Sequence, residues 1–102
     1  MTVGKPVVVR GEVVETSCFL RDGKRGEGHR ACALVCLKNG GQLGIVEDTS
    51  GTFYSLATNS PGTDPNAAVK EFVAQHVSVD ARLYERGGQK MLVIQRVQRL
   101  GD

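Results

Sequence analysis

The feature that most constrains the fold of this chain is a set of five short segments with the composition of β-strands. Each is rich in β-branched residues or alternates apolar with polar side chains, as a strand with one buried face does. In the clearest, 77–85, alternate residues from Val77 to Leu83 are apolar, and a two-glycine turn at 86–89 follows, which predicts a β-hairpin. We expect strands over residues 7–17, 42–47, 52–57, 77–85 and 90–98.

Two further segments predict helices. Residues 29–38 read HRACALVCLK and end at Asn-Gly-Gly, where the left-handed conformation that ends a helix is easily adopted. The preceding stretch, 20–28, holds three glycines and predicts a loop. A second helix is expected to begin at Asp64, its capping residue, with Pro65 at its first position. Its apolar face would consist of Ala68, Val69, Phe72 and Val73.

The elements follow one another as strand, loop and helix, two strands, helix, and two strands. Five strands with a helix between the third and fourth have the element order of an OB-fold, a small five-stranded barrel. Segment 18–40 would then be an insertion between strands one and two, where OB-folds carry ligand-contacting loops. The expected fold is therefore mainly β, a single OB-fold-like domain over 1–102, with an open α+β sheet as the alternative.

Composition limits the class of protein. A chain of 102 residues forms one domain with a modest core, and a net charge of +2 is too small to indicate a polyanionic partner. No apolar run approaches the roughly 18 residues that span a bilayer. No basic stretch followed by an apolar run opens the sequence, so we expect no signal peptide within it.

The main functional clue is a cluster of three cysteines and one histidine. His29, Cys32 and Cys36 would lie within an arc of roughly 60° on one helix at ~100° per residue. Cys18, across the flexible loop, would supply a fourth ligand. Three sulfurs and an imidazole are a recurring tetrahedral set for zinc, which is the expected cofactor. Copper(I), an iron–sulfur centre or haem iron are the alternative transition-metal cofactors, because sulfur-rich sites suit them.

Other interpretations of the cysteines stay open. Cys32 and Cys36 would be small core residues, or Cys18 would form a disulfide with one of them and pin the helix to the barrel. The odd number of cysteines, three, favours metal ligation or a free thiol over a fold held together by disulfides alone. A thiol of lowered pKa in this basic segment would also react with peroxides or disulfides, although no C-x-x-C motif is present.

Basic residues of the same segment form a candidate anion- or partner-binding surface: Arg21, Lys24, Arg25 and Arg30. They would also lower the thiol pKa values and offset the charge of metal-bound thiolates. OB-folds often bind single-stranded nucleic acid, but that needs stacking aromatics, and only Phe19, Phe53 and Tyr54 are candidates. The expected partners are therefore a metal ion and a protein rather than nucleic acid. The alternative function is an OB-fold module that binds nucleic acid or oligoanions and contains a structural disulfide. Since no carboxylate stands out as a catalytic base, a carrier, sensor or interaction module is expected rather than an enzyme.

Three stretches carry a further pattern: Gly11-x-Val13-x-x-Thr16-x-Cys18, then His29 with Cys32-Ala33-x-x-Cys36, and Val79-x-Ala81-x-Leu83-Tyr84-Glu85-Arg86-Gly87-Gly88. In these motifs the chain resembles a family of small, largely uncharacterised bacterial OB-fold-like proteins, many of them exported. The resemblance covers most of residues 7–98. It implies the barrel fold, a metal site at the cysteines and a periplasmic or exported location, with the cytoplasm as the alternative. It implies no particular reaction.

Overall fold

The first strand of the computed structural model, β1 (Lys5–Glu15), is long enough to pair with two neighbours. Residues 5–12 pair with β4 (His76–Arg86) and residues 11–15 with β2 (Leu43–Glu47), both antiparallel. The two pairings overlap at Gly11 and Glu12, and a Cβ atom at Gly11 would lie 2.2 Å from the carbonyl oxygen of Val46. Gly11 therefore marks a close approach of two backbones, one of the positions in a strand where glycine is favoured.

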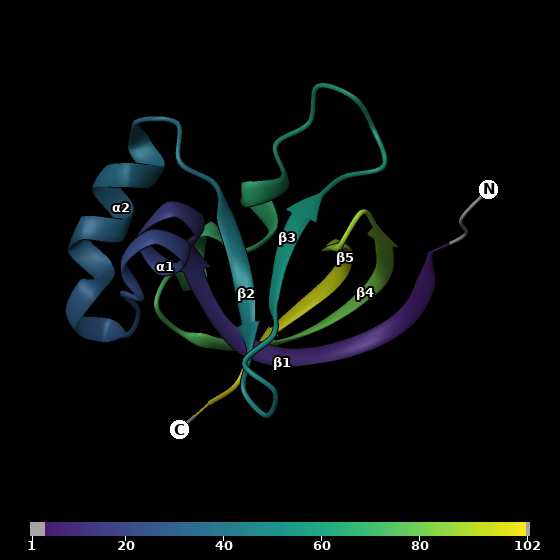
Figure 1. Ribbon diagram of the computed structural model, residues 1–102, viewed down its shortest axis with the longest axis horizontal. Helices are drawn as coiled ribbons and strands as arrows, with labels where there is room; N and C mark the ends of the chain where they lie inside the picture. The colour runs from purple at the N-terminus through teal and green to yellow at the C-terminus, as the bar shows by residue number, and fades with distance from the viewer. Residues whose placement is uncertain (1–3, 102) are drawn as a thin grey trace.

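The remaining strands close the barrel. β3 (Phe53–Ala57) runs antiparallel to β2, and β5 (Gln89–Arg99) pairs antiparallel with β4 and parallel with β3. The strand order is β1-β2-β3-β5-β4, with β4 returning to β1 (Figure 1). The predicted five strands are confirmed, and the closed barrel is consistent with an OB-fold-like architecture rather than an open sheet. The structure describes residues 4–101.

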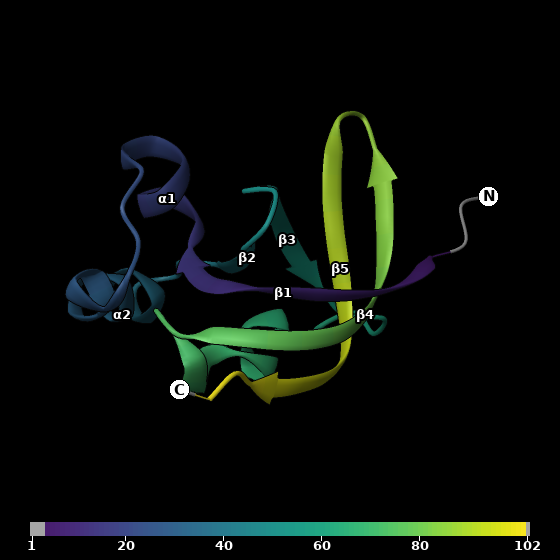
Figure 2. The ribbon, with the colours of Figure 1, turned by 90° about the horizontal axis from the view of Figure 1, so that it is seen from below.

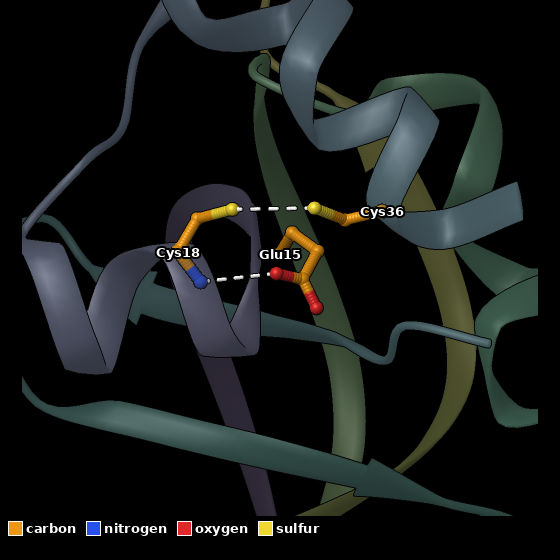
Figure 3. A group of neighbouring side chains, drawn as sticks. All are labelled: Glu15, Cys18 and Cys36. Atoms are coloured by element: carbon orange, nitrogen blue, oxygen red, sulfur yellow. Dashed lines mark hydrogen bonds between the residues drawn. The ribbon is translucent and has the colours of Figure 1, made fainter. Parts of the chain in front are cut away.

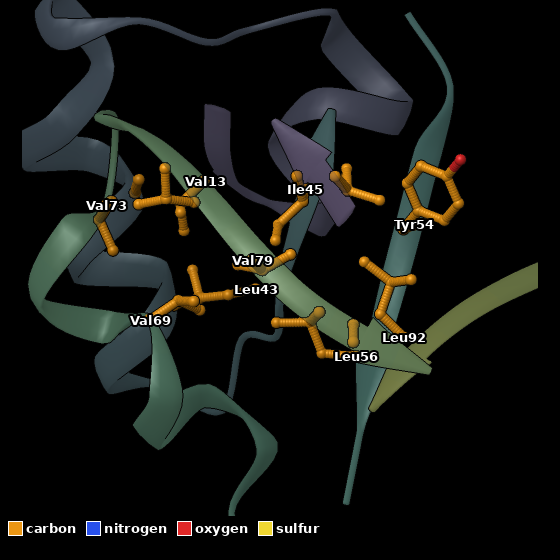
Figure 4. Close-up of a cluster of buried hydrophobic side chains, with 13 residues drawn as sticks. Val13, Leu43, Ile45, Tyr54, Leu56, Val69, Val73, Val79 and Leu92 are labelled. Carbon is orange, nitrogen blue, oxygen red and sulfur yellow. The ribbon is translucent and has the colours of Figure 1, made fainter. Parts of the chain in front are cut away.

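Alternating apolar residues of the strands fill the barrel (Figure 4). Val77, Val79 and Ala81 are buried as the alternation of β4 predicted, and Leu83 packs against the same cluster. Tyr54 is buried whereas its neighbour Phe53 is half-buried and outside that cluster, because successive strand residues point to opposite faces. The core is therefore built mainly by the barrel strands.

Between β1 and β2 the chain forms two helices rather than the one predicted. α1 (Thr16–Asp22) replaces the end of the strand predicted over 7–17 and the start of the loop predicted over 20–28. α2 (Arg30–Lys38) follows a short 3₁₀ turn, Glu27–His29, and confirms the expected helix. Both helices lie together beside one end of the barrel (Figures 1 and 2). Ala33 of α2 is buried in the barrel core, which fixes this helix against the strands.

The helix predicted from Asp64 is reduced to two 3₁₀ turns, Pro65–Ala68 and Lys70–Phe72. The predicted cap is present, because the Asp64 side chain accepts a hydrogen bond from the Asn66 N–H at 2.9 Å. The helical turns do not continue past Val73 because the next residue is hydrogen-bonded to β1: the Ala74 N–H donates to the Val13 carbonyl. Val69 and Val73 are nevertheless fully buried, so the predicted apolar face is used without a regular helix.

Candidate metal centre

Three potential ligands converge where β1, α1 and α2 meet (Figure 3). Glu15 ends β1, Cys18 belongs to α1 and Cys36 to the last turn of α2. The two Sγ atoms are 3.7 Å apart. With a carboxylate oxygen of Glu15 they form a group whose ligand atoms all lie within 4.8 Å of one another. Within residues 4–101 no other set of three or more histidine, cysteine or acidic side chains is placed this closely.

Glu15 is held in this group because it caps α1. Its Oε1 accepts hydrogen bonds from the Ser17 hydroxyl and, at 3.0 Å, from the Cys18 N–H, so it satisfies donors that the first turn leaves unpaired. The helix ends at Gly23, whose φ of 68° is the left-handed conformation typical of this position. Sequence reasoning missed both α1 and Glu15. The available signal was an acidic residue three positions before Cys18 together with Gly23 after the last turn.

The environment of Cys18 stabilises its protonated form. Burial, the largest cause, and hydrogen bonds with Glu15 and Cys36 together raise the pKa of the Cys18 thiol to about 11. For Cys18, this corrects the prediction that nearby basic residues lower the pKa of the thiol. For Glu15, burial raises the pKa, but hydrogen bonds from Ser17 and Cys18 outweigh it and leave the pKa below its usual value. An anionic carboxylate therefore faces a protonated thiol.

An open cleft of about 540 Å³ borders this group. Glu15 and Cys36 form part of its wall, and the start of α1 at 16–17 and the turn at 39–42 form the rest. Cys18 is 4% exposed, whereas Cys36 is half-buried. Solvent and solutes therefore reach the group from the Cys36 side, while Cys18 lies behind it.

The structure brings together two of the four predicted ligands and places the other two elsewhere. Cys32 is exposed on α2, one turn before Cys36, and it is the sulfur of Cys36 that lies against Cys18 of α1. His29 belongs to the 3₁₀ turn that precedes α2, so the helical spacing assumed for residues 29, 32 and 36 does not apply to it. Its Nε2 atom is buried and has no hydrogen-bond partner among the described residues.

The four basic residues predicted to bind anions have mostly structural contacts. Arg21 pairs with its neighbour Asp22 at 2.9 Å, and Arg30 Nε donates to the carbonyl of Val73 at 3.3 Å. Lys24 is exposed in the loop that follows α1.

Arg25 has the most specific of these contacts. Its Nε lies 2.9 Å from Oε1 of Glu12, a carboxylate on the outer side of β1 whose side chain is only 5% exposed. The second oxygen of Glu12 accepts a hydrogen bond from the Gly26 N–H. The ion pair and this hydrogen bond fasten the loop between α1 and α2 to the barrel.

We expect Arg25→Ala to lower the free energy of unfolding by about 1–2 kcal/mol, because it leaves the buried carboxylate of Glu12 without its cationic partner. Urea unfolding followed by circular dichroism measures this change. Lys24→Ala is the matched control, since it removes an exposed charge from the same loop and should alter stability by less than about 0.5 kcal/mol. Equal effects of the two substitutions would show that the Glu12 contact contributes nothing specific.

Two of the three aromatic residues considered for nucleic-acid binding contact each other, and the third is buried. Phe19 of α1 stacks on Phe53 of β3 with ring centroids 5.9 Å apart, and the Arg25 guanidinium lies 5.8 Å from the Phe19 centroid. Tyr54 is 8% exposed and belongs to the core. These contacts dock α1 on the outside of the barrel and help to position Cys18.

Comparison with known proteins gives no match to a family model, to a curated protein or to a solved structure. Within residues 4–101, no helix has both the length and the apolar character needed to cross a membrane.

Proposed function

We propose that this protein binds one transition-metal ion through Cys18, Cys36 and Glu15 and acts as a carrier, sensor or interaction module. One observation carries the proposal: two thiols from different helices lie 3.7 Å apart, and a buried carboxylate shares their space. Thiolates and carboxylates are both established ligands of zinc. This ligand set replaces the four residues expected from the sequence, since Cys32 and His29 lie outside the group.

The number of protein ligands supports an exchangeable site. Structural zinc sites use four protein ligands, whereas sites with three leave a position for water or another ligand. Here the cleft beside Cys36 supplies access to that position. An ion bound in this way can be passed on or can recruit a ligand from a protein partner, as a carrier or docking module requires.

The donor chemistry favours zinc among the candidate metals. Copper(I) and iron–sulfur centres prefer sulfur ligands, and iron–sulfur clusters usually need four cysteines. The group at the centre offers two sulfurs and one carboxylate. A mixed set of this kind suits zinc, a borderline-soft ion that accepts sulfur, nitrogen and oxygen ligands.

Nucleic-acid binding has weaker support as an alternative. Phe19 and Phe53 stack on each other, and Arg25 is paired with Glu12. Binding of single strands relies on aromatic faces and cations that are available to bases and phosphates.

The direct experiment is elemental analysis of protein that has been purified under reducing conditions without an affinity tag, reconstituted with zinc and desalted. We expect close to one zinc ion per chain. Zinc at background level after reconstitution would overturn the proposal.

Metal removal should loosen the helical segment and leave the barrel intact. α2 has nine residues, a length that is marginal for an isolated helix, and the ion would tie it to α1 and to the end of β1. We expect amide hydrogen exchange over residues 16–38 to accelerate at least about tenfold with a chelator, as loss of about 1.4 kcal/mol of local stability would produce. Strands β4 and β5 should keep their protection. Unchanged exchange in the helices would mean that Ala33 and its neighbours hold them without metal.

A further inference from the structure

We infer that Cys18 and Cys36 form a redox pair whose closure to a disulfide releases the bound metal. The release step rests on the proposed function, whereas disulfide formation does not and is tested separately. The inference concerns Cys18 and Cys36, which the structure places in contact, and it gives no role to the exposed Cys32.

The geometry favours closure of this pair. A disulfide needs a sulfur–sulfur distance of about 2.05 Å, and the two Sγ atoms start 3.7 Å apart on facing helices. Their approach is a movement of less than about 2 Å, shared between α1 and α2. The linker between the helices includes Gly23, Gly26 and Gly28, and open space surrounds the Cα atom of each, although the N–H of Gly26 is held by Glu12.

The oxidant is a low-molecular-weight disulfide that enters by the cleft. The half-buried Cys36 loses its proton to solvent and attacks one sulfur of the oxidant, whose sulfur–sulfur bond breaks and releases one thiolate. Cys36 then carries a mixed disulfide. The released thiolate takes a proton from solvent, so the first exchange is balanced.

The second exchange uses the buried cysteine. Cys18 lies behind Cys36, with its Sγ 3.7 Å from that of Cys36. The Cys18 sulfur attacks Sγ of Cys36, the sulfur–sulfur bond of the mixed disulfide breaks, and the departing thiolate takes up the proton that Cys18 loses. Overall the two protein thiols lose two electrons and two protons, and the oxidant is reduced to two thiols.

Closure and metal binding exclude each other because they use the same sulfur atoms. A thiolate is the metal ligand, and a disulfide sulfur has lost that charge. Glu15 would then be the remaining protein ligand of the group, too few to retain zinc. Reduction of the disulfide restores the site.

The first test uses metal-free protein, oxidised glutathione at pH 8, acid quenching and mass spectrometry. Cys32→Ser should lose two hydrogens, retain no glutathione and yield one cross-linked peptide pair containing Cys18 and Cys36. Cys18→Ser, made in the Cys32→Ser background, should stop at a glutathione adduct on Cys36. Persistent glutathione on Cys36 in the Cys32→Ser protein, with Cys18 still open to alkylation, would overturn the inference.

The second test uses zinc-loaded Cys32→Ser protein and a chromophoric zinc chelator. Excess oxidised glutathione should release about one zinc ion for each disulfide formed, and a reductant followed by zinc should restore binding. Disulfide formation with zinc retained would overturn the inference while leaving the proposed function in place. Failure of the reduced protein to bind zinc would overturn the proposed function and the release step, and the metal-free assay would still report on the redox pair.

Discussion

Replacing Cys36 by serine should lower zinc affinity by more than about 100-fold, and replacing Cys18 should do the same. Loss of a residue that merely orients a metal ligand costs about 10–100-fold, so loss of a thiolate ligand costs more. The two sulfurs lie 3.7 Å apart, and neither has a substitute within the group. Competition titration against a chromophoric chelator under reducing conditions measures the affinity.

Cys32→Ser is the matched control for these variants. It makes the same chemical change four residues before Cys36 on the same helix, at an exposed side chain outside the group. We expect its zinc affinity to stay within about threefold of the unaltered protein, which corresponds to less than about 1 kcal/mol. A loss as large as that of Cys36→Ser would return Cys32 to the ligand set predicted from the sequence.

Gly11→Ala should be the most destabilising single-methyl addition in the barrel. The new Cβ would lie 2.2 Å from the Val46 carbonyl oxygen and 2.8 Å from Cγ2 of Ile45. The first of these is backbone, so β1 and β2 must separate where β1 pairs with β2 and β4 at once. We expect a loss of about 3 kcal/mol, or roughly 12–24 °C in the unfolding temperature.

Gly28→Ala serves as the control for this prediction. Gly28 lies in the 3₁₀ turn before α2, has open space around its Cα and does not require a positive φ. Its substitution should change stability by less than about 0.5 kcal/mol. Thermal unfolding of both variants by calorimetry makes the comparison, and similar transition temperatures would show that β1 and β2 accommodate the methyl group.

The barrel could be predicted because each strand carries its own local signal. Alternation in β4 predicted which of its side chains enter the core, and the two glycines at 87–88 predicted the hairpin to β5. The helix expected after Asp64 was wrong in form because Val13 of a distant strand exchanges hydrogen bonds with residues 74 and 75. Such a contact overrides local propensity and leaves no trace in the segment itself.

The candidate site was predictable only in part. The predicted set includes the two cysteines that the structure brings together, but a helical spacing rule cannot tell which end of α2 meets another helix. That depends on α1, which was missed because its Thr and Ser residues continue a strand-like run and its end is rich in charge. Glu15 joins the candidate group because it caps α1, which places its carboxylate beside Cys18. The zinc site, the exported location of the protein and the resemblance to a family of bacterial OB-fold-like proteins stay predictions.

The most direct test of the proposed centre is X-ray absorption spectroscopy of the zinc-loaded, reduced protein. The structure predicts two sulfur ligands at about 2.3 Å, with the remaining first-shell atoms oxygen or nitrogen at about 2.0–2.2 Å. Cys18→Ser and Cys36→Ser should each reduce the sulfur count or abolish binding, and Cys32→Ser should leave the spectrum unchanged. Three sulfur ligands in the unaltered protein, or an unaltered spectrum in Cys36→Ser, would contradict a centre built from Glu15, Cys18 and Cys36.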